Sequence, residues 1–236
     1  MRRKKADMSD LILPGDPPIA LCLRRSAAAR RISLRVSQLD GRVTLTLPKA
    51  LRQAEALAFA QEKEPWIRKH LAARGQDVPV EIGAELMIGG QMYRVQSGAG
   101  RKIVLTDGVV QVPGPLAQAG VRLGAHLREQ ARIQLTESAD FYAARLGRGY
   151  SRLALRDTRS RWGSCSSDGR LMFSWRLILA PPTVLNYVAA HEVAHLAEMN
   201  HSPAFWHRVQ TLFGDYGAAR SWLQHSGRDL HRFRFP

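Results

Sequence analysis

The chain has 236 residues, of which 45% are hydrophobic, so it has enough apolar side chains for a packed core. Its 35 Lys and Arg outnumber 20 Asp and Glu, and the net charge of +15 favours anionic partners such as nucleic acid or nucleotides. Only two cysteines occur and no apolar run approaches about 18 residues, which excludes a disulfide framework and predicts a cytoplasmic protein without a membrane helix.

Hydrophobic periodicity changes several times along the first half of the chain. Residues 1–20 combine charges with three prolines, and we predict a basic, flexible tail there. Apolar residues then alternate with polar ones between residues 31 and 48, on both sides of Leu39-Asp40-Gly41, which predicts a β-hairpin. Helical spacing between residues 51 and 74 predicts two short helices that are separated near Pro65.

The second half alternates between strand and helix signals. Strand patterns fill residues 79–113, and residues 116–147 predict one long helix that ends at glycine. A returning strand is expected over residues 171–178 and a helix over residues 182–199, which begins at a proline pair.

These patterns predict an α+β protein in which antiparallel strands and a helix make up the C-terminal part. We divide the chain into the tail (1–20), a β-rich N-terminal region that also contains helices (21–114) and a C-terminal domain (115–236).

The segment His191-Glu192-Val193-Ala194-His195 is an H-E-x-x-H motif on the last predicted long helix. Its histidines are four residues apart, so both imidazoles project from one helical face and can bind a tetrahedral Zn²⁺. Glu192 is rotated around the helix, where it can reach metal-bound water without occupying a coordination position. The alternative is a pair of buried histidines that are hydrogen-bonded to backbone carbonyl groups.

A catalytic zinc site needs a third protein ligand, and His201 is the leading candidate. We expect Asn200 to end the helix in the left-handed conformation and Ser202-Pro203 to begin the next one, so that His201 lies in a tight turn. Glu198 is a rival ligand one turn beyond His195. Cys165 as a fourth ligand would close the site. Three further histidines, His207, His225 and His231, fit surface or packing roles better.

Longer segments resemble the YgjP-type predicted zinc metallopeptidases, a family related to SprT and WLM metalloproteases. The resemblance rests on Arg161-Trp162-Gly163-Ser164-Cys165-Ser166, Phe173-Ser174-Trp175-Arg176-Leu177-Ile178-Leu179-Ala180-Pro181 and the segment His191–Trp206, together with the hairpin and helix near the N-terminus. It implies that residues 115–236 form a zincin-like domain and that zinc is bound by His191, His195 and His201. Ser174 departs from the expected asparagine and leaves contacts with the substrate open.

We therefore expect hydrolysis in which Glu192 takes a proton from zinc-bound water and returns it to the leaving group. Arg161, Tyr187 and Arg176 are candidates for stabilising the oxyanion, and residues 171–179 are a candidate strand for pairing with a peptide substrate. The competing functions are hydrolysis of a nucleotide or phosphate ester, and a nucleic-acid-associated protein whose metal is structural. An intact Glu192 argues against a structural metal, because such a site needs no base.

Overall fold

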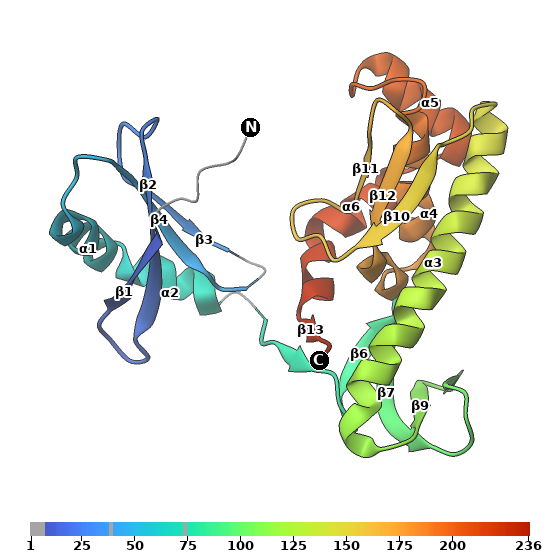
Figure 1. The fold of residues 1–236 in the computed structure, drawn as a ribbon, viewed down its shortest axis with the longest axis horizontal. Coiled ribbons are helices and arrows are strands. Elements are labelled where there is room, and N and C mark those ends of the chain that lie inside the picture. Colours follow the sequence, from blue (N-terminus) through green and yellow to red (C-terminus); the bar gives the residue numbers. More distant parts are fainter. Residues whose placement is uncertain (1–7, 38–39, 73–74) are drawn as a thin grey trace. The chain divides into compact units, whose positions relative to one another are not determined.

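The computed structural model describes residues 8–37, 40–72 and 75–236. The chain is an α+β protein that forms two compact units, Met1–Gln76 and Asp77–Pro236 (Figure 1). Each unit has its own hydrophobic core. The basic head at residues 1–7, Leu39 of the predicted turn and the predicted helix end at residue 74 lie outside the described residues.

The first unit is a four-stranded sheet with two helices along it (Figure 1). The predicted hairpin is confirmed, because β3 and β4 pair antiparallel and alternate residues of β4 are buried. The helix break is also confirmed, and it falls at Lys63. The strand order is β1-β2-β4-β3, and the elements are β1 (Met8–Leu13), β2 (Ile19–Ser26), β3 (Ser33–Val36), β4 (Val43–Pro48), α1 (Gln53–Glu62) and α2 (Glu64–Ala72).

The prediction of a loose tail over residues 1–20 was wrong from residue 8 onward. Strand β1 pairs antiparallel with β2 along its whole length, and Leu13 is completely buried in the core of the unit. The prolines lie in the connection that follows β1. They therefore belong to the turn and do not interrupt the strand.

The second unit begins with small strands that pack against a long helix. Its described strands and helices in this part are β5 (Val78–Pro79), β6 (Glu85–Ile88), β7 (Gln91–Gly98), β8 (Val104–Thr106), β9 (Val109–Pro113), the 3-10 turn η1 (Leu116–Gln118) and α3 (Ala119–Leu146). The strands β6-β7-β9-β8 form one sheet. The predicted long helix is confirmed, and Gly147 ends it with φ 70°.

The boundary that we predicted after residue 114 differs from the division of the structure at Gln76. Val95 and Val110, from the small sheet, share a core with Leu123 and Leu127 of α3. Strand β5 pairs in parallel with the C-terminal strand β13 (Phe233–Arg234). Both contacts join segments that are distant in the sequence, which is why local patterns could not locate the division.

A three-stranded sheet lies beside α3 (Figure 1). It consists of β10 (Arg152–Arg156), β11 (Gly163–Cys165) and β12 (Arg170–Ser174), in the order β10-β12-β11. The expectation of antiparallel strands holds for β11 and β12, but β10 and β12 are parallel. The predicted returning strand ends at Ser174, after which Trp175–Leu179 (η2) forms a 3-10 turn.

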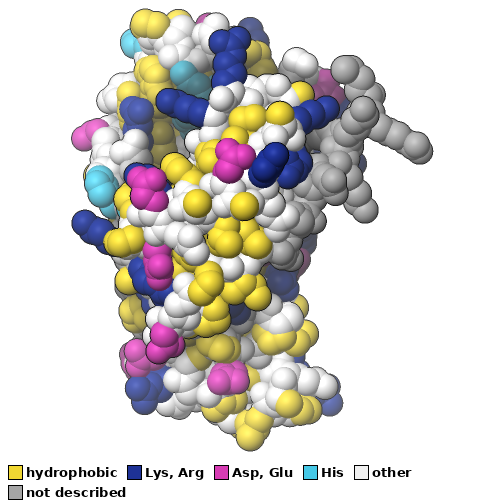
Figure 2. Space-filling view, turned by 90° about the vertical axis from the view of Figure 1, so that its left-hand side faces the viewer, with side chains coloured by type: hydrophobic (Ala, Val, Ile, Leu, Met, Phe, Trp, Pro, Cys, Tyr) yellow, Lys and Arg dark blue, Asp and Glu magenta, His cyan; other side chains and the backbone are white. Residues whose placement is uncertain are grey.

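Four further elements complete the unit: α4 (Pro182–Ala194), α5 (Pro203–Phe213), α6 (Gly217–His225) and the 3-10 turn η3 (Gly227–His231). Most residues of helix α4 are buried, and the helix ends at Ala194, five residues before the predicted end. Among the described helices, none combines the length and apolarity that a bilayer crossing needs. On the face drawn in Figure 2, hydrophobic side chains lie exposed among basic and acidic ones.

Candidate metal centre

Three of the eight histidines converge at the C-terminal end of α4. One ligand atom from each of His191, His195 and His201 can be chosen so that all three lie within 4.8 Å of one another. The Nε2 atoms of His191 and His201 are 3.1 Å apart. In a tetrahedral zinc site with ordinary Zn–N bonds, ligand nitrogens are about 3.3 Å apart. The spacing of these nitrogens therefore fits a small cation.

The turn between α4 and α5 brings His201 back over the helix. Ser202 is the N-cap of α5 and its Oγ accepts a hydrogen bond from the amide of Phe205 (3.4 Å), as predicted. Asn200 does not adopt the expected left-handed conformation, since Asp107 is the one described non-glycine residue with positive φ. The Oδ1 atom of Asn200 instead accepts a hydrogen bond from the amide of Ser202 (3.2 Å) and closes the turn.

Two of the three histidines, His191 and His195, are held in the neutral form that can bind a metal. Burial, followed by the nearby His195 and His201, lowers the pKa of His191 to about 3, and burial lowers the pKa of His195. The Nδ1 atom of His195 lies 2.9 Å from the carbonyl oxygen of Glu198 and can donate to it, which leaves Nε2 for a metal. Three imidazole nitrogens are a donor set that suits zinc better than magnesium or calcium.

The rival ligands do not join this group. Glu198 contributes its backbone carbonyl to His195, and neither its carboxylate nor the Cys165 thiol belongs to the cluster of possible ligand atoms. Burial, with the charges of Glu192 and Asp168, raises the pKa of Cys165 to about 11, which disfavours the thiolate form in the absence of a metal.

The other histidines lie apart from the cluster. His207 and His225 are exposed, on α5 and α6 respectively. His231 is buried, with its ring centroid 5.2 Å from that of Trp162.

Glu192 lies beside the histidines in a cavity of about 270 Å³ that β11 and the α4–α5 turn also line. Only 6% of Glu192 is exposed, and this burial raises its pKa to about 8, although the positive charge of Arg161 opposes the shift. Strand β11 approaches very closely here: a Cβ atom at Gly163 would lie 2.5 Å from both Cγ and Oε1 of Glu192. A glycine is therefore required for this contact.

Aromatic rings fix the orientation of the imidazoles. Phe205 stacks on His195 with ring centroids 4.3 Å apart, and Trp206 stacks on His201 at 5.6 Å. These two residues therefore pack the α4–α5 turn against the histidine rings. Tyr187 makes an edge contact with the His191 ring, with ring centroids 5.9 Å apart.

The chain matches a known protein family. The model of the YgjP-like metallopeptidase domain matches residues 30–226. The chain belongs to the YgjP-like family. It is therefore placed among the metallopeptidases, which are hydrolases. A solved structure, the metallopeptidase zymogen abylysin of Pyrococcus abyssi, is 20% identical and covers 44% of this chain and 97% of its own, with a TM-score of 0.34. No curated protein matches the chain.

Two of the residues that we considered for oxyanion stabilisation are buried in this YgjP-like protein. Arg176 forms an ion pair with Asp157 (2.7 Å) and donates to the carbonyl oxygens of Leu230 and Phe233 (2.9 Å each), so it cannot reach a substrate. Tyr187 is buried beneath His191. Ser174 is also completely buried, which contradicts a direct contact with substrate.

Sequence reasoning missed Tyr216 and Arg220. Tyr216 stacks between Tyr187 and Trp206, with ring centroids 5.9 and 5.3 Å away. The guanidinium of Arg220 lies 4.6 Å from the Trp206 ring centroid, and its charge contributes to the lowered pKa of His191. Both residues come from the region of α6, and no spacing relative to the H-E-x-x-H motif points to them.

Proposed function

We propose that this protein is a zinc-dependent metallopeptidase in which His191, His195 and His201 hold the metal and Glu192 transfers protons. The observation that carries the proposal is the convergence of three imidazoles and one buried carboxyl group in a single cavity. A bound Zn²⁺ would supply Lewis acidity, which polarises the scissile carbonyl and acidifies water. The family match supports a peptide bond as the substrate.

Glu192 has the properties of a general base and acid. Burial raises its pKa, so its carboxylate attracts a proton more strongly than the carboxylate of an exposed glutamate does. The positive charge of Arg161 acts in the opposite direction and favours the ionised form. The side chain would accept a proton on a carboxylate oxygen during attack and then donate it to the leaving amine. The close approach of Gly163 restricts the carboxyl group to the cavity, where this transfer must occur.

A peptide substrate would pair with β11. The sequence favours pairing with residues 171–179, but β12 is the central strand of its sheet, with β10 and β11 on its two sides. Among the described strands, β11 pairs with β12 alone, so its outer edge is available for an extended peptide. Because Gly163 and Cys165 also line the cavity, a peptide at this edge would place a carbonyl near the histidines.

Metal content and turnover together test the proposal. We expect close to one zinc per chain by elemental analysis after reconstitution, and cleavage of a mixed peptide library detected by mass spectrometry. Glu192→Gln should retain zinc and lose roughly 10²- to 10⁴-fold in turnover. The matched control is Glu137→Gln, an exposed glutamate on α3, which should retain both.

The alternatives have distinct outcomes. Hydrolysis of nucleotides without any peptide cleavage would favour a phosphate-ester hydrolase. Stoichiometric zinc with no Glu192-dependent turnover on either substrate class would indicate a structural metal. Both cysteines are free thiols, in keeping with the reducing cytoplasm that we propose as the compartment.

A further inference from the structure

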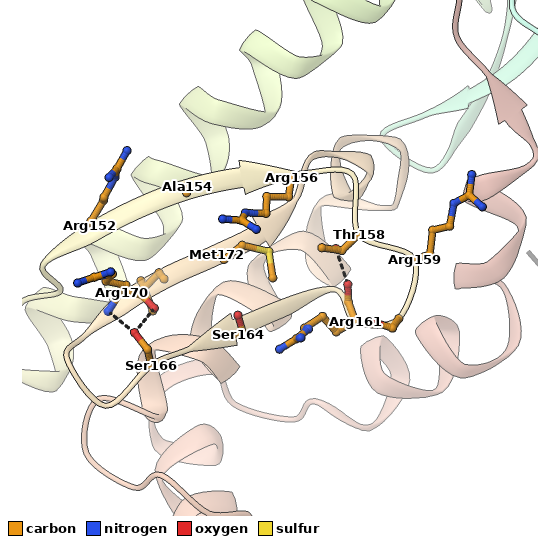
Figure 3. A pocket seen from close by; sticks show the side chains of 12 residues that line it. Arg152, Ala154, Arg156, Thr158, Arg159, Arg161, Ser164, Ser166, Arg170 and Met172 are labelled. Carbon is orange, nitrogen blue, oxygen red and sulfur yellow. Dashed lines mark hydrogen bonds between the residues drawn. The ribbon is translucent and has the colours of Figure 1, made fainter. Parts of the chain in front are cut away.

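A second cavity, of about 450 Å³, lies on the outer face of the β10-β12-β11 sheet (Figure 3). Its floor is a cross-strand row of small or uncharged residues, because Met172 of β12 is in register with Ala154 of β10 and with Ser164 of β11. Arginines surround this floor. We call this surface the arginine face and define it by Arg152, Arg156, Arg159, Arg161 and Arg170.

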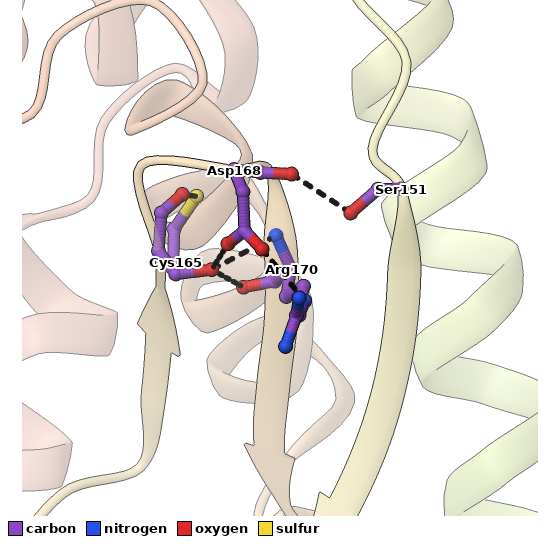
Figure 4. A network of polar contacts seen from close by, with 5 residues as sticks. Ser151, Cys165, Asp168 and Arg170 are labelled. Carbon is purple, nitrogen blue, oxygen red and sulfur yellow. Dashed lines mark hydrogen bonds and ion pairs between the residues drawn. The ribbon is translucent and has the colours of Figure 1, made fainter.

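The arginine face carries a concentrated positive charge. Of its twelve described lining residues, five are arginines and none is acidic. Arg152 and Arg170 are directly opposite each other in the sheet, an arrangement of like charges that costs stability. Asp168 offsets one of them, since its Oδ2 lies 2.7 Å from Nε of Arg170 (Figure 4). Arg152, Arg156 and Arg161 are exposed and form no ion pair with the described residues.

The spacing of these charges suits an elongated polyanion. Arg152 and Arg156 are four residues apart on one side of β10, so their Cα atoms are about 13 Å apart. Arginines thus stand at both ends of the floor, where two separate anionic groups of one ligand can bind. Guanidinium groups match phosphate oxygens in two-pronged hydrogen bonds, and no lysine lines the cavity.

We propose that the arginine face binds the phosphate backbone of nucleic acid. The floor contains no aromatic residue on which a base could stack, so contacts would be with the backbone and independent of sequence. A peptide fits this face less well, because backbone groups of the central strand are already paired within the sheet and the free strand edge is that of β11. The proposal does not depend on the peptidase function.

Fluorescence anisotropy of the full zinc-loaded chain with a labelled 20-nucleotide single strand tests this proposal. The test variant is Arg152→Gln/Arg156→Gln. The matched control is Arg101→Gln/Arg208→Gln, which makes the same change in charge at exposed positions outside the cavity. We expect the test pair to weaken binding roughly tenfold and to reduce the slope of log K against log salt by about 1.4. The control pair should bind like wild type.

Three results would overturn the proposal. They are the absence of binding by wild type at low salt, an equal loss in both pairs of variants, and an affinity for labelled polyglutamate as high as that for the strand, which would indicate a site for acidic peptides. Thermal unfolding of both variants verifies that they are folded. Since anisotropy reports binding and not hydrolysis, its result is independent of whether the peptidase proposal holds.

Discussion

Substitution of Gly163 by alanine tests how closely β11 controls the proposed base. The φ angle of Gly163 lies outside the left-handed region, so an alanine is compatible with the backbone and the effect is steric. The added Cβ would lie 2.5 Å from Cγ and Oε1 of Glu192, whereas ordinary contacts begin near 3.4 Å. The Glu192 side chain or the strand must therefore shift by about 0.9 Å.

The magnitude follows from this displacement. A catalytic group that is misplaced by about 1 Å can lose roughly 10²-fold in rate, and we expect a loss of that order in kcat for Gly163→Ala. Overpacking should also lower the free energy of unfolding by about 1–3 kcal/mol. The three atoms nearest to the new methyl group all belong to Glu192 and none to a histidine, so we expect the zinc content to be unchanged.

The assay is peptide turnover of zinc-loaded enzyme, with zinc measured on the same samples. Gly149→Ala is the matched control, because that glycine has open space around its Cβ position and no positive φ. If Gly163 acts through Glu192, adding Gly163→Ala to Glu192→Gln should cause little further loss. The reasoning would be refuted if Gly163→Ala kept full turnover. It would also be refuted if the loss of turnover in the double variant equalled the product of the losses in the two single variants.

Three other predictions concern the metal and stability. Replacement of His201 by alanine should weaken zinc affinity roughly hundredfold or more, measured by competition with a chelator, whereas Glu198→Ala should retain it; the reverse would make Glu198 the ligand. Burial, followed by the charge of Arg176, lowers the pKa of His231 from 6.5 to about 4. The unfolded chain therefore binds more protons between these pH values, and stability is lost as the pH falls. Between pH 7 and pH 5 we expect a loss of about 2 kcal/mol from this group, measured by urea unfolding of zinc-free protein, which His231→Gln removes and His207→Gln does not. An unchanged pH dependence in His231→Gln would contradict this. Finally, Asp157→Ala should cost about 1–3 kcal/mol in the same assay, because it removes the half-exposed counter-ion of the buried Arg176, while Asp168→Ala, at an exposed pair, should stay near wild type. Equal losses in the free energy of unfolding of the two variants would show that the burial of Arg176 does not increase the cost of removing its counter-ion.

Local sequence was sufficient for the features that depend on residues a few positions apart. The four-residue spacing of His191 and His195 places both rings on one side of α4, and the Ser202-Pro203 start of α5 directs His201 back towards them. The β3–β4 hairpin and the long helix α3 also follow from short-range periodicity and turn residues. The metal-ligand set could thus be proposed without any knowledge of the fold.

Tertiary structure alone decided the features that join distant segments. The parallel pairing of β10 with β12, the contact of Gly163 with Glu192 and the aromatic stack that includes Tyr216 each depend on how separate elements pack. The arginine face is assembled in the same way, from three strands and their connections. Periodicity reports which side of an element is apolar, but it does not specify which element covers that side. That choice is made by the packing of the whole chain, and it determined the surroundings of Glu192.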